Sequence, residues 1–156
     1  MHIVVATDAA WVLDELRAAL EAPDTTFTIC SDGRAVTEAV RTQTPDIAVL
    51  DLQIGTMGGM AVTMQLRLDE SSGLLPHVPV LMLLGRSADI HLARRSAADG
   101  WLIKPLDALR IRRAVAAVAG GGSHLEGVPA EPPASPETVA GEPHAESPNG
   151  EPATTG

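Results

Sequence analysis

Short apolar runs alternate with longer helix-like segments along the first 119 residues, and this alternation constrains the fold more than any other feature of the chain. The runs contain almost no polar residue, as in Ile47 to Leu50 and Pro79 to Leu84. Strands that are apolar on both faces must be covered on both faces, which is typical of parallel sheets with helical crossovers. The sequence therefore predicts an α/β fold with helices on both sides of one sheet.

The pattern predicts five strands, each followed by a helix. The strands are expected at residues 3–6, 25–30, 47–50, 79–84 and 101–103. Asp32 and Asp107 are expected to cap the second and fifth helices, because a carboxylate accepts hydrogen bonds from the free amides of a first helical turn. Right-handed crossovers bring the carboxyl ends of all the strands to one edge of the sheet, where such folds bind ligands.

The composition changes at the run of three glycines that begins with Gly120. Residues 1–119 hold all 11 basic residues, whereas residues 120–156 hold six glutamates, seven prolines and neither lysine nor arginine. A segment of this kind buries too little apolar surface to offset the entropy of ordering. We therefore expect one domain at residues 1–119 and a disordered acidic tail at residues 120–156.

Composition also limits the partners and the compartment. Cys30 is the one cysteine, which excludes an internal disulfide and fits a reducing compartment. No apolar stretch is long enough to span a bilayer, and the N-terminus lacks the features of a signal peptide. The net charge of −9 disfavours nonspecific binding to phosphate backbones. We expect a cytoplasmic protein whose partners are neither membrane nor nucleic acid.

Charged residues follow three of the predicted strands. Asp8 follows the first strand, Asp51 the third and Lys104 the fifth. Lys104 is the one lysine among 11 basic residues, and lysine offers a compact point charge where arginine is a wide planar fork. An aspartate after a strand is often only a turn former or a helix cap, and Asp8 would suit the first helix. Together the three residues predict a pocket with two carboxylates and an ammonium.

Four segments, in this order and spacing, resemble the receiver domain of bacterial response regulators, the CheY-like family. They are Pro45 to Leu52, Met57 to Met60, Pro79 to Leu83 and Ala98 to Pro105. The resemblance covers residues 2 to about 118. It implies a doubly wound, five-stranded parallel sheet with the flavodoxin-like order 2-1-3-4-5.

The resemblance also implies a role for each residue at the strand ends. Asp51 matches the family's phosphoacceptor, and Lys104 matches the lysine that pairs with this carboxylate and then with the phosphoryl oxygen. Asp8, Asp51 and the backbone carbonyl of Gln53 match the ligands of Mg²⁺, which prefers hard oxygen donors. Pro105 matches a proline that commonly follows a cis peptide bond.

Several departures from the family pattern lie around this pocket. Thr7 stands where a second acid is usual, so less negative charge would face the metal. Leu84 replaces a Ser or Thr whose hydroxyl binds the phosphoryl group, which weakens the expected switch. Gly55 replaces a proline and is expected to loosen the loop beside Asp51. The stretch between Leu84 and Lys104 is about two residues short, so a trimmed fourth helix is expected.

The resulting hypothesis is a single-domain response regulator of a two-component phosphorelay, not an enzyme. It would receive a phosphoryl group from a histidine kinase or a phosphotransfer protein and signal by contact with an unknown output protein, since the tail cannot form an output domain. The face made by the fourth helix, fifth strand and fifth helix would meet that partner or form a homodimer. Trp101 and Leu84 are the expected switch residues; alternatively, Trp101 packs in the core under a solvated arginine face. That face would carry Arg94, Arg95, Arg110, Arg112 and Arg113.

Three other interpretations stay open. Thr7 and Leu84 favour a degenerate receiver that binds a partner without phosphorylation. A flavodoxin-like cofactor binder would need a phosphate-cradling loop after the first strand, where Asp8 places a negative charge instead. A phosphatase of the haloacid dehalogenase type would need a second aspartate two residues after Asp51, where Gln53 stands.

Overall fold

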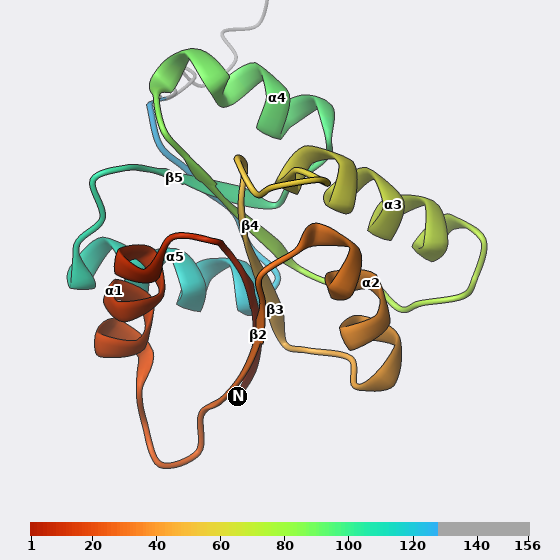
Figure 1. Ribbon diagram of the computed structural model, residues 1–156, viewed down its shortest axis with the longest axis horizontal. Coiled ribbons are helices and arrows are strands. Elements are labelled where there is room, and N and C mark those ends of the chain that lie inside the picture. The colour runs from red at the N-terminus through yellow and green to blue at the C-terminus, as the bar shows by residue number, and fades with distance from the viewer. Residues whose placement is uncertain (128–156) are drawn as a thin grey trace, which may run out of the picture.

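A parallel sheet with helices on both faces forms the described part of the chain, residues 1–127 of a computed structural model (Figure 1). The sheet has six strands in the order β2-β1-β3-β4-β5-β6, so the predicted order 2-1-3-4-5 is confirmed. The strands are β1 (His2–Ala6), β2 (Thr26–Cys30), β3 (Ile47–Asp51), β4 (Val80–Leu84), β5 (Gly100–Ile103) and β6 (His124–Leu125).

The sixth strand corrects the predicted five-stranded sheet. It lies in a part of the chain that the sequence assigned to the tail, and it pairs in parallel with β5, with Gly100 opposite His124 and Trp101 opposite Leu125. A strand of two residues is too short to show an alternating pattern of apolar and polar residues in the sequence. Whether it forms depends on the sheet edge that it meets. The rest of the predicted tail, residues 128–156, lies outside the described residues.

Five helices and one short 3₁₀ turn connect the strands. They are α1 (Ala10–Leu20), α2 (Gly33–Thr42), α3 (Gly59–Ser71), the 3₁₀ turn η1 (Ser87–Asp89), α4 (Ile90–Arg95) and α5 (Ala108–Ala119). The helix α4 has six residues, which agrees with the expected trimming. Within the described residues, no helix combines the length and the apolarity needed to cross a bilayer.

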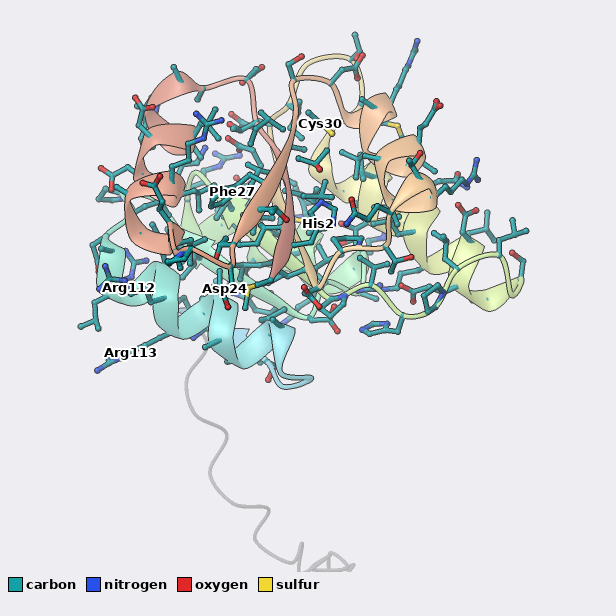
Figure 2. The ribbon with its side chains drawn as sticks, turned by 90° about the horizontal axis from the view of Figure 1, so that it is seen from below. His2, Asp24, Phe27, Cys30, Arg112 and Arg113 are labelled. Carbon is teal, nitrogen blue, oxygen red and sulfur yellow. The ribbon has the colours of Figure 1, made fainter. Side chains whose placement is uncertain are left out.

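The side chains of each strand alternate between two core layers. In β1, Ile3 and Val5 pack with α1 and α5, whereas Val4 packs with α2 and α3 on the opposite face. Figure 2 looks onto the β2 edge and shows α1 and α5 together on one side. The Nε of Arg112 joins this layer by donating to the carbonyl of Ala19 in α1 at 2.9 Å. All residues of β3 and β4 are buried, as their apolar sequences predict.

Both expected helix caps form. The Asp32 carboxylate accepts from the Arg34 amide at 2.9 Å, and the Asp107 carboxylate accepts from the Arg110 amide at 2.9 Å. These backbone hydrogen bonds favour the charged form and lower the pKa of both carboxyls. In contrast, α1 starts after Ala9 without a side-chain cap, so the Asp8 carboxylate is not used in this way.

Candidate functional site

The ends of β1, β3 and β5 bring a carboxylate and an ammonium together. Asp51 is the last residue of β3 and is 2% exposed, while Lys104 directly follows β5. The Nζ of Lys104 lies 3.0 Å from Asp51 Oδ1 and 2.8 Å from Asp51 Oδ2. The peptide bond between Lys104 and Pro105 is cis, as the family resemblance implies. A carboxylate this deeply buried needs a partner charge, and the lysine supplies it.

Thr7 contributes a hydrogen bond that sequence reasoning missed. Its hydroxyl donates to Asp51 Oδ2 at 3.1 Å and accepts from the Ala9 amide at 3.1 Å. The side chain is nearly fully buried at the end of β1. The sequence presented Thr7 only as the loss of an acid, yet a hydroxyl at this strand end orients the Asp51 carboxylate. The contact could have been expected from the sequence, because Thr7 is a hydroxyl residue at the end of the first strand, next to the strand that ends in Asp51.

The loop after β3 closes the site from the other side. The amide of Gln53 donates to Asp51 Oδ1 at 3.3 Å. The amide of Gly55 donates to Asp8 Oδ2 at 3.3 Å, so the exposed Asp8 side chain faces this loop. A proline has no amide hydrogen and could not make that contact. Gly55 therefore connects the loop to Asp8, a contact that the sequence did not suggest.

The carboxylates of Asp8 and Asp51 are the acidic groups that this site offers to a cation. Residues 1–127 contain no cluster of three His, Cys, Asp or Glu side chains arranged to hold a metal ion. Mg²⁺ is commonly held by one or two carboxylates together with waters and phosphate oxygens, so it does not need such a cluster. The donor set therefore fits Mg²⁺ better than it fits a metal that requires an all-protein cage.

Trp11 stands at the mouth of the site and was not predicted as a site residue. The Nζ of Lys104 lies 5.5 Å from the centroid of the Trp11 ring, within the range of a cation–π contact. The ring is 50% exposed. Trp11 thus shields one side of the ammonium whose other side meets Asp51.

The two predicted switch residues are both buried. Leu84 is 0% exposed and packs in an apolar cluster with Met82, Ala93 and Trp101. Trp101 is 2% exposed, so it lies in the core, and the Arg94 guanidinium lies 5.9 Å from its ring centroid. The Leu84 carbonyl accepts from the Lys104 amide at 2.8 Å, which connects this cluster to the site.

The predicted arginine face is not one surface. Arg112 reaches α1 through the carbonyl of Ala19, on the other side of α5 from the expected face. Figure 2 shows Arg112 next to α1 and Arg113 pointing away from the sheet. Arg110 instead turns toward β5 and pairs with Glu126, which follows β6. The arginines of α5 therefore have different partners on different sides of this helix.

The sequence of residues 3–116 matches the family model of the response regulator receiver domain. The chain belongs to this family, which accounts for the strand order and for the position of Asp51 at the end of β3. It follows that the chain contains the receiver domain of a two-component response regulator.

Two curated relatives show which members of the family the chain is similar to. The transcriptional regulatory protein CseB of Streptomyces coelicolor is 32% identical over 134 residues, which cover 81% of this chain and 55% of CseB. The DNA-binding response regulator MtrA of Mycobacterium tuberculosis is 31% identical over 106 residues, which cover 67% of this chain and 44% of MtrA. The chain thus spans about half the length of these relatives. Both relatives are named as regulators of transcription or as DNA-binding proteins, so they do not support the expectation that nucleic acid is not a partner.

A solved structure agrees with the fold. The receiver domain of a sensor histidine kinase from Pseudomonas aeruginosa, described with a magnesium ion coordinated in its active site cleft, superposes with a TM-score of 0.67. The match covers 76% of this chain and 97% of that domain, at 19% identity. At this identity the likeness shows the receiver fold alone.

Proposed function

We propose that Asp51 accepts a phosphoryl group from a phosphohistidine of a histidine kinase or phosphotransfer protein. The observation that carries the proposal is the contact of Lys104 Nζ with both Asp51 oxygens, at 3.0 and 2.8 Å, at the carboxyl end of the sheet. Asp51 is the carboxylate held in this way, whereas Asp8 is exposed. The pocket thus presents one oriented nucleophile next to one compact cation.

The transfer exchanges one bond to phosphorus for another. An oxygen of Asp51 attacks the phosphorus, a P–O bond forms, and the P–N bond of the phosphohistidine breaks as the imidazole leaves with the bonding electrons. The Lys104 ammonium then faces the negative charge of the transferred group, and positioning with charge stabilisation supplies most of the catalysis in such reactions. The Thr7 hydroxyl holds Asp51 Oδ2, which leaves the carboxylate in a defined orientation.

Mg²⁺ fits this proposal through the carboxylates of Asp8 and Asp51 and the backbone carbonyl of Gln53. When bound, the ion supplies neutralisation of the phosphoryl oxygens. The Gly55 amide holds Asp8 Oδ2 at 3.3 Å and so keeps the exposed carboxylate turned toward the loop after β3. With one acid after β1 in place of two, we expect weaker Mg²⁺ binding than in receivers with an acid at the position of Thr7.

Labelling with acetyl phosphate tests the proposal directly. The protein is incubated with acetyl phosphate and Mg²⁺, and its intact mass is measured. Wild type should gain the mass of one phosphoryl group, and the Asp51→Ala variant should gain none. Asp24→Ala is the matched control, because Asp24 lies before β2 at the opposite edge of the sheet (Figure 2). A wild-type protein that stays unlabelled, under conditions that label a standard receiver, would exclude this function.

In this proposal the chain acts in the cytoplasm as an acceptor without turnover of its own, and its output is contact with another protein. A second function is favoured by Leu84, which is 0% exposed and offers no hydroxyl to a phosphoryl group. The chain would then be a degenerate receiver whose affinity for its partner does not depend on phosphorylation. Partner affinity measured before and after labelling separates the two functions, since equal affinities favour the degenerate receiver.

A further inference from the structure

The outer edge of β5 is occupied by residues 123–127 of the same chain, named here the edge segment. Its strand β6 pairs in parallel with β5, and in Figure 1 this blue strand runs beside β5 toward α4. An unpaired edge strand presents a row of free amides and carbonyls that readily accepts another strand. The edge segment therefore fills a site that β5 would otherwise leave open at residues 100 to 103.

Glu126 makes most of the specific contacts of the edge segment. Its Oε2 accepts from the Ile103 amide at 2.9 Å, so the carboxylate continues the hydrogen bonding of β5 beyond β6. Its Oε1 accepts from Arg110 Nε at 2.8 Å, and its Oε2 pairs with a second nitrogen of the same guanidinium. Its backbone carbonyl accepts from the buried indole of Trp101 at 2.8 Å. One glutamate thus satisfies donors from β5 and α5.

The binding groups for this glutamate are held by other contacts. Arg110 also donates to the carbonyls of Ile103 and Pro105, at 2.7 and 2.6 Å, so its fork is fixed against the backbone on both sides of Lys104. A guanidinium in this position matches a carboxylate through two parallel hydrogen bonds. Partial burial alone would raise the pKa of Glu126, but the hydrogen bonds from Arg110 and the Ile103 amide outweigh it and lower the pKa.

The end of the edge segment reaches α4. Gly127 has φ of 69°, which favours glycine, and a Cβ at this position would lie 3.0 Å from Ile90 Cδ1 and 3.2 Å from Ile103 Cδ1. Ile90 is the first residue of α4. The edge segment therefore contacts α4, β5 and α5, the three elements of the face on which the sequence placed a partner or a second copy.

We propose that the β5 edge is a docking site for an extended peptide that carries a glutamate followed by a glycine, and that the edge segment occupies it in cis. The two residues correspond to Glu126 and Gly127. A second copy or an output protein that uses this face must first displace the edge segment. This proposal does not depend on phosphorylation of Asp51.

The Glu126→Lys variant of the full chain tests whether the edge segment can be released. The charge reversal places an ammonium against Arg110, so the segment should leave the edge. The chain has two tryptophans, so the two indole N–H signals in a nitrogen-correlated NMR spectrum report Trp101 without overlap. We expect the Trp101 signal to move and the exchange of the Ile103 amide to speed up by at least about tenfold. Glu21→Lys, with the same charge change on an exposed residue after α1, should alter neither signal.

A synthetic peptide with the sequence of residues 122–127 tests docking in trans. It should bind Glu126→Lys and return both signals toward their wild-type positions, whereas a peptide with lysine in place of glutamate should not. Wild type should not bind the peptide, because the tethered edge segment has a much higher effective concentration at the β5 edge than the free peptide has. Gly127→Val provides a second release variant in which the charges are unchanged, and far-ultraviolet circular dichroism checks that both variants fold.

Two results would overturn the proposal. One is a Trp101 indole signal and an Ile103 amide that are unchanged in both Glu126→Lys and Gly127→Val. The other is a released variant that does not bind the peptide. Neither measurement uses a phosphoryl donor. A failure to label Asp51 therefore does not affect these two tests, and a failure of these tests does not affect the labelling of Asp51.

Discussion

Two pairs of cation and carboxylate lie near the carboxyl end of β5, and they are built differently. Lys104 meets Asp51 through one nitrogen that contacts both oxygens, and the two side chains are 18% and 3% exposed. Arg110 meets Glu126 through two nitrogens, with side chains 33% and 18% exposed. Arg110 also donates to the carbonyls on both sides of Lys104.

The difference shows how one chain uses its two kinds of cation. A compact ammonium can keep its contact while the oxygens around it are exchanged for those of a phosphoryl group. A planar guanidinium in bidentate contact holds one partner in one orientation. The deep pair at Asp51 is therefore suited to chemistry, and the shallower pair at Glu126 is suited to holding the edge segment.

Exchange of the lysine for an arginine should have the largest effect. In Lys104→Arg the wide guanidinium must fit between Asp51 and the Trp11 ring, where the ammonium now lies 5.5 Å from the ring centroid. We expect the rate of labelling by acetyl phosphate to fall at least about 100-fold, the usual cost of one misplaced transition-state contact. Arg113→Lys is the control for a basic exchange outside the site. Labelling of Lys104→Arg at the wild-type rate would show that any cation suffices.

A hydroxyl at position 84 should lower stability, because Leu84 is fully buried in an apolar cluster with Met82, Ala93 and Trp101. We expect Leu84→Thr to lower the free energy of unfolding by about 2 kcal/mol, from lost apolar contact and a buried hydroxyl. Urea unfolding measures the change. Leu109→Thr, at a position 56% exposed, should cost no more than about 0.5 kcal/mol. Equal midpoints for Leu84→Thr and wild type would mean that the cluster tolerates the polar group.

The reciprocal exchange at the second pair should cost less. Arg110→Lys keeps the charge opposite Glu126 but loses the fork that reaches the Ile103 and Pro105 carbonyls. We expect the free energy of unfolding to fall by about 1 kcal/mol, and the Ile103 amide to exchange faster. The measurement is hydrogen exchange followed by NMR, with Arg113→Lys as the unaffected control. If Arg110→Lys protects Ile103 as well as wild type does, the fork is not what holds the edge segment.

The smallest effect should come from acidification. Hydrogen bonds from Arg110 and the Ile103 amide lower the pKa of Glu126 in spite of its partial burial. A lowered folded-state pKa means that the pair stabilises the edge segment above the ordinary glutamate value and loses this effect as the pH falls through the folded value. The imidazole of His124 faces the same carboxylate, with its Nε2 3.5 Å from Glu126 Oε1.

The Trp101 indole signal followed by NMR measures this titration. It should stay constant from about pH 6 to about pH 4.3 and move toward its position in Glu126→Lys only below that. The stability change involved should be under about 1 kcal/mol, as for other partly exposed pairs. A transition near neutral pH would instead point to a group other than Glu126.

The alternation of strands and helices and the caps at Asp32 and Asp107 were predicted because their causes are local or repeated, whereas the strand order came from the resemblance to the receiver family. The apolar strands specify burial on both faces, and Asp32 and Asp107 each accept from an amide two or three residues away. The contacts of Thr7 with Asp51 and of Gly55 with Asp8 were missed, since each joins residues 44 or 47 positions apart. The pattern of residue types shows which groups reach the sheet edge but not which of them touch.

By itself, the sequence determined that the chain folds as alternating strands and helices and that Asp51 and Lys104 end two of the strands. These are consequences of apolar runs and of one lysine at the end of one run. Only the tertiary structure decided where Glu126 lies, because its partners Ile103 and Arg110 are 23 and 16 positions away and belong to different elements. A free strand edge selects its partner by position in space, and no local pattern in the sequence encodes that position.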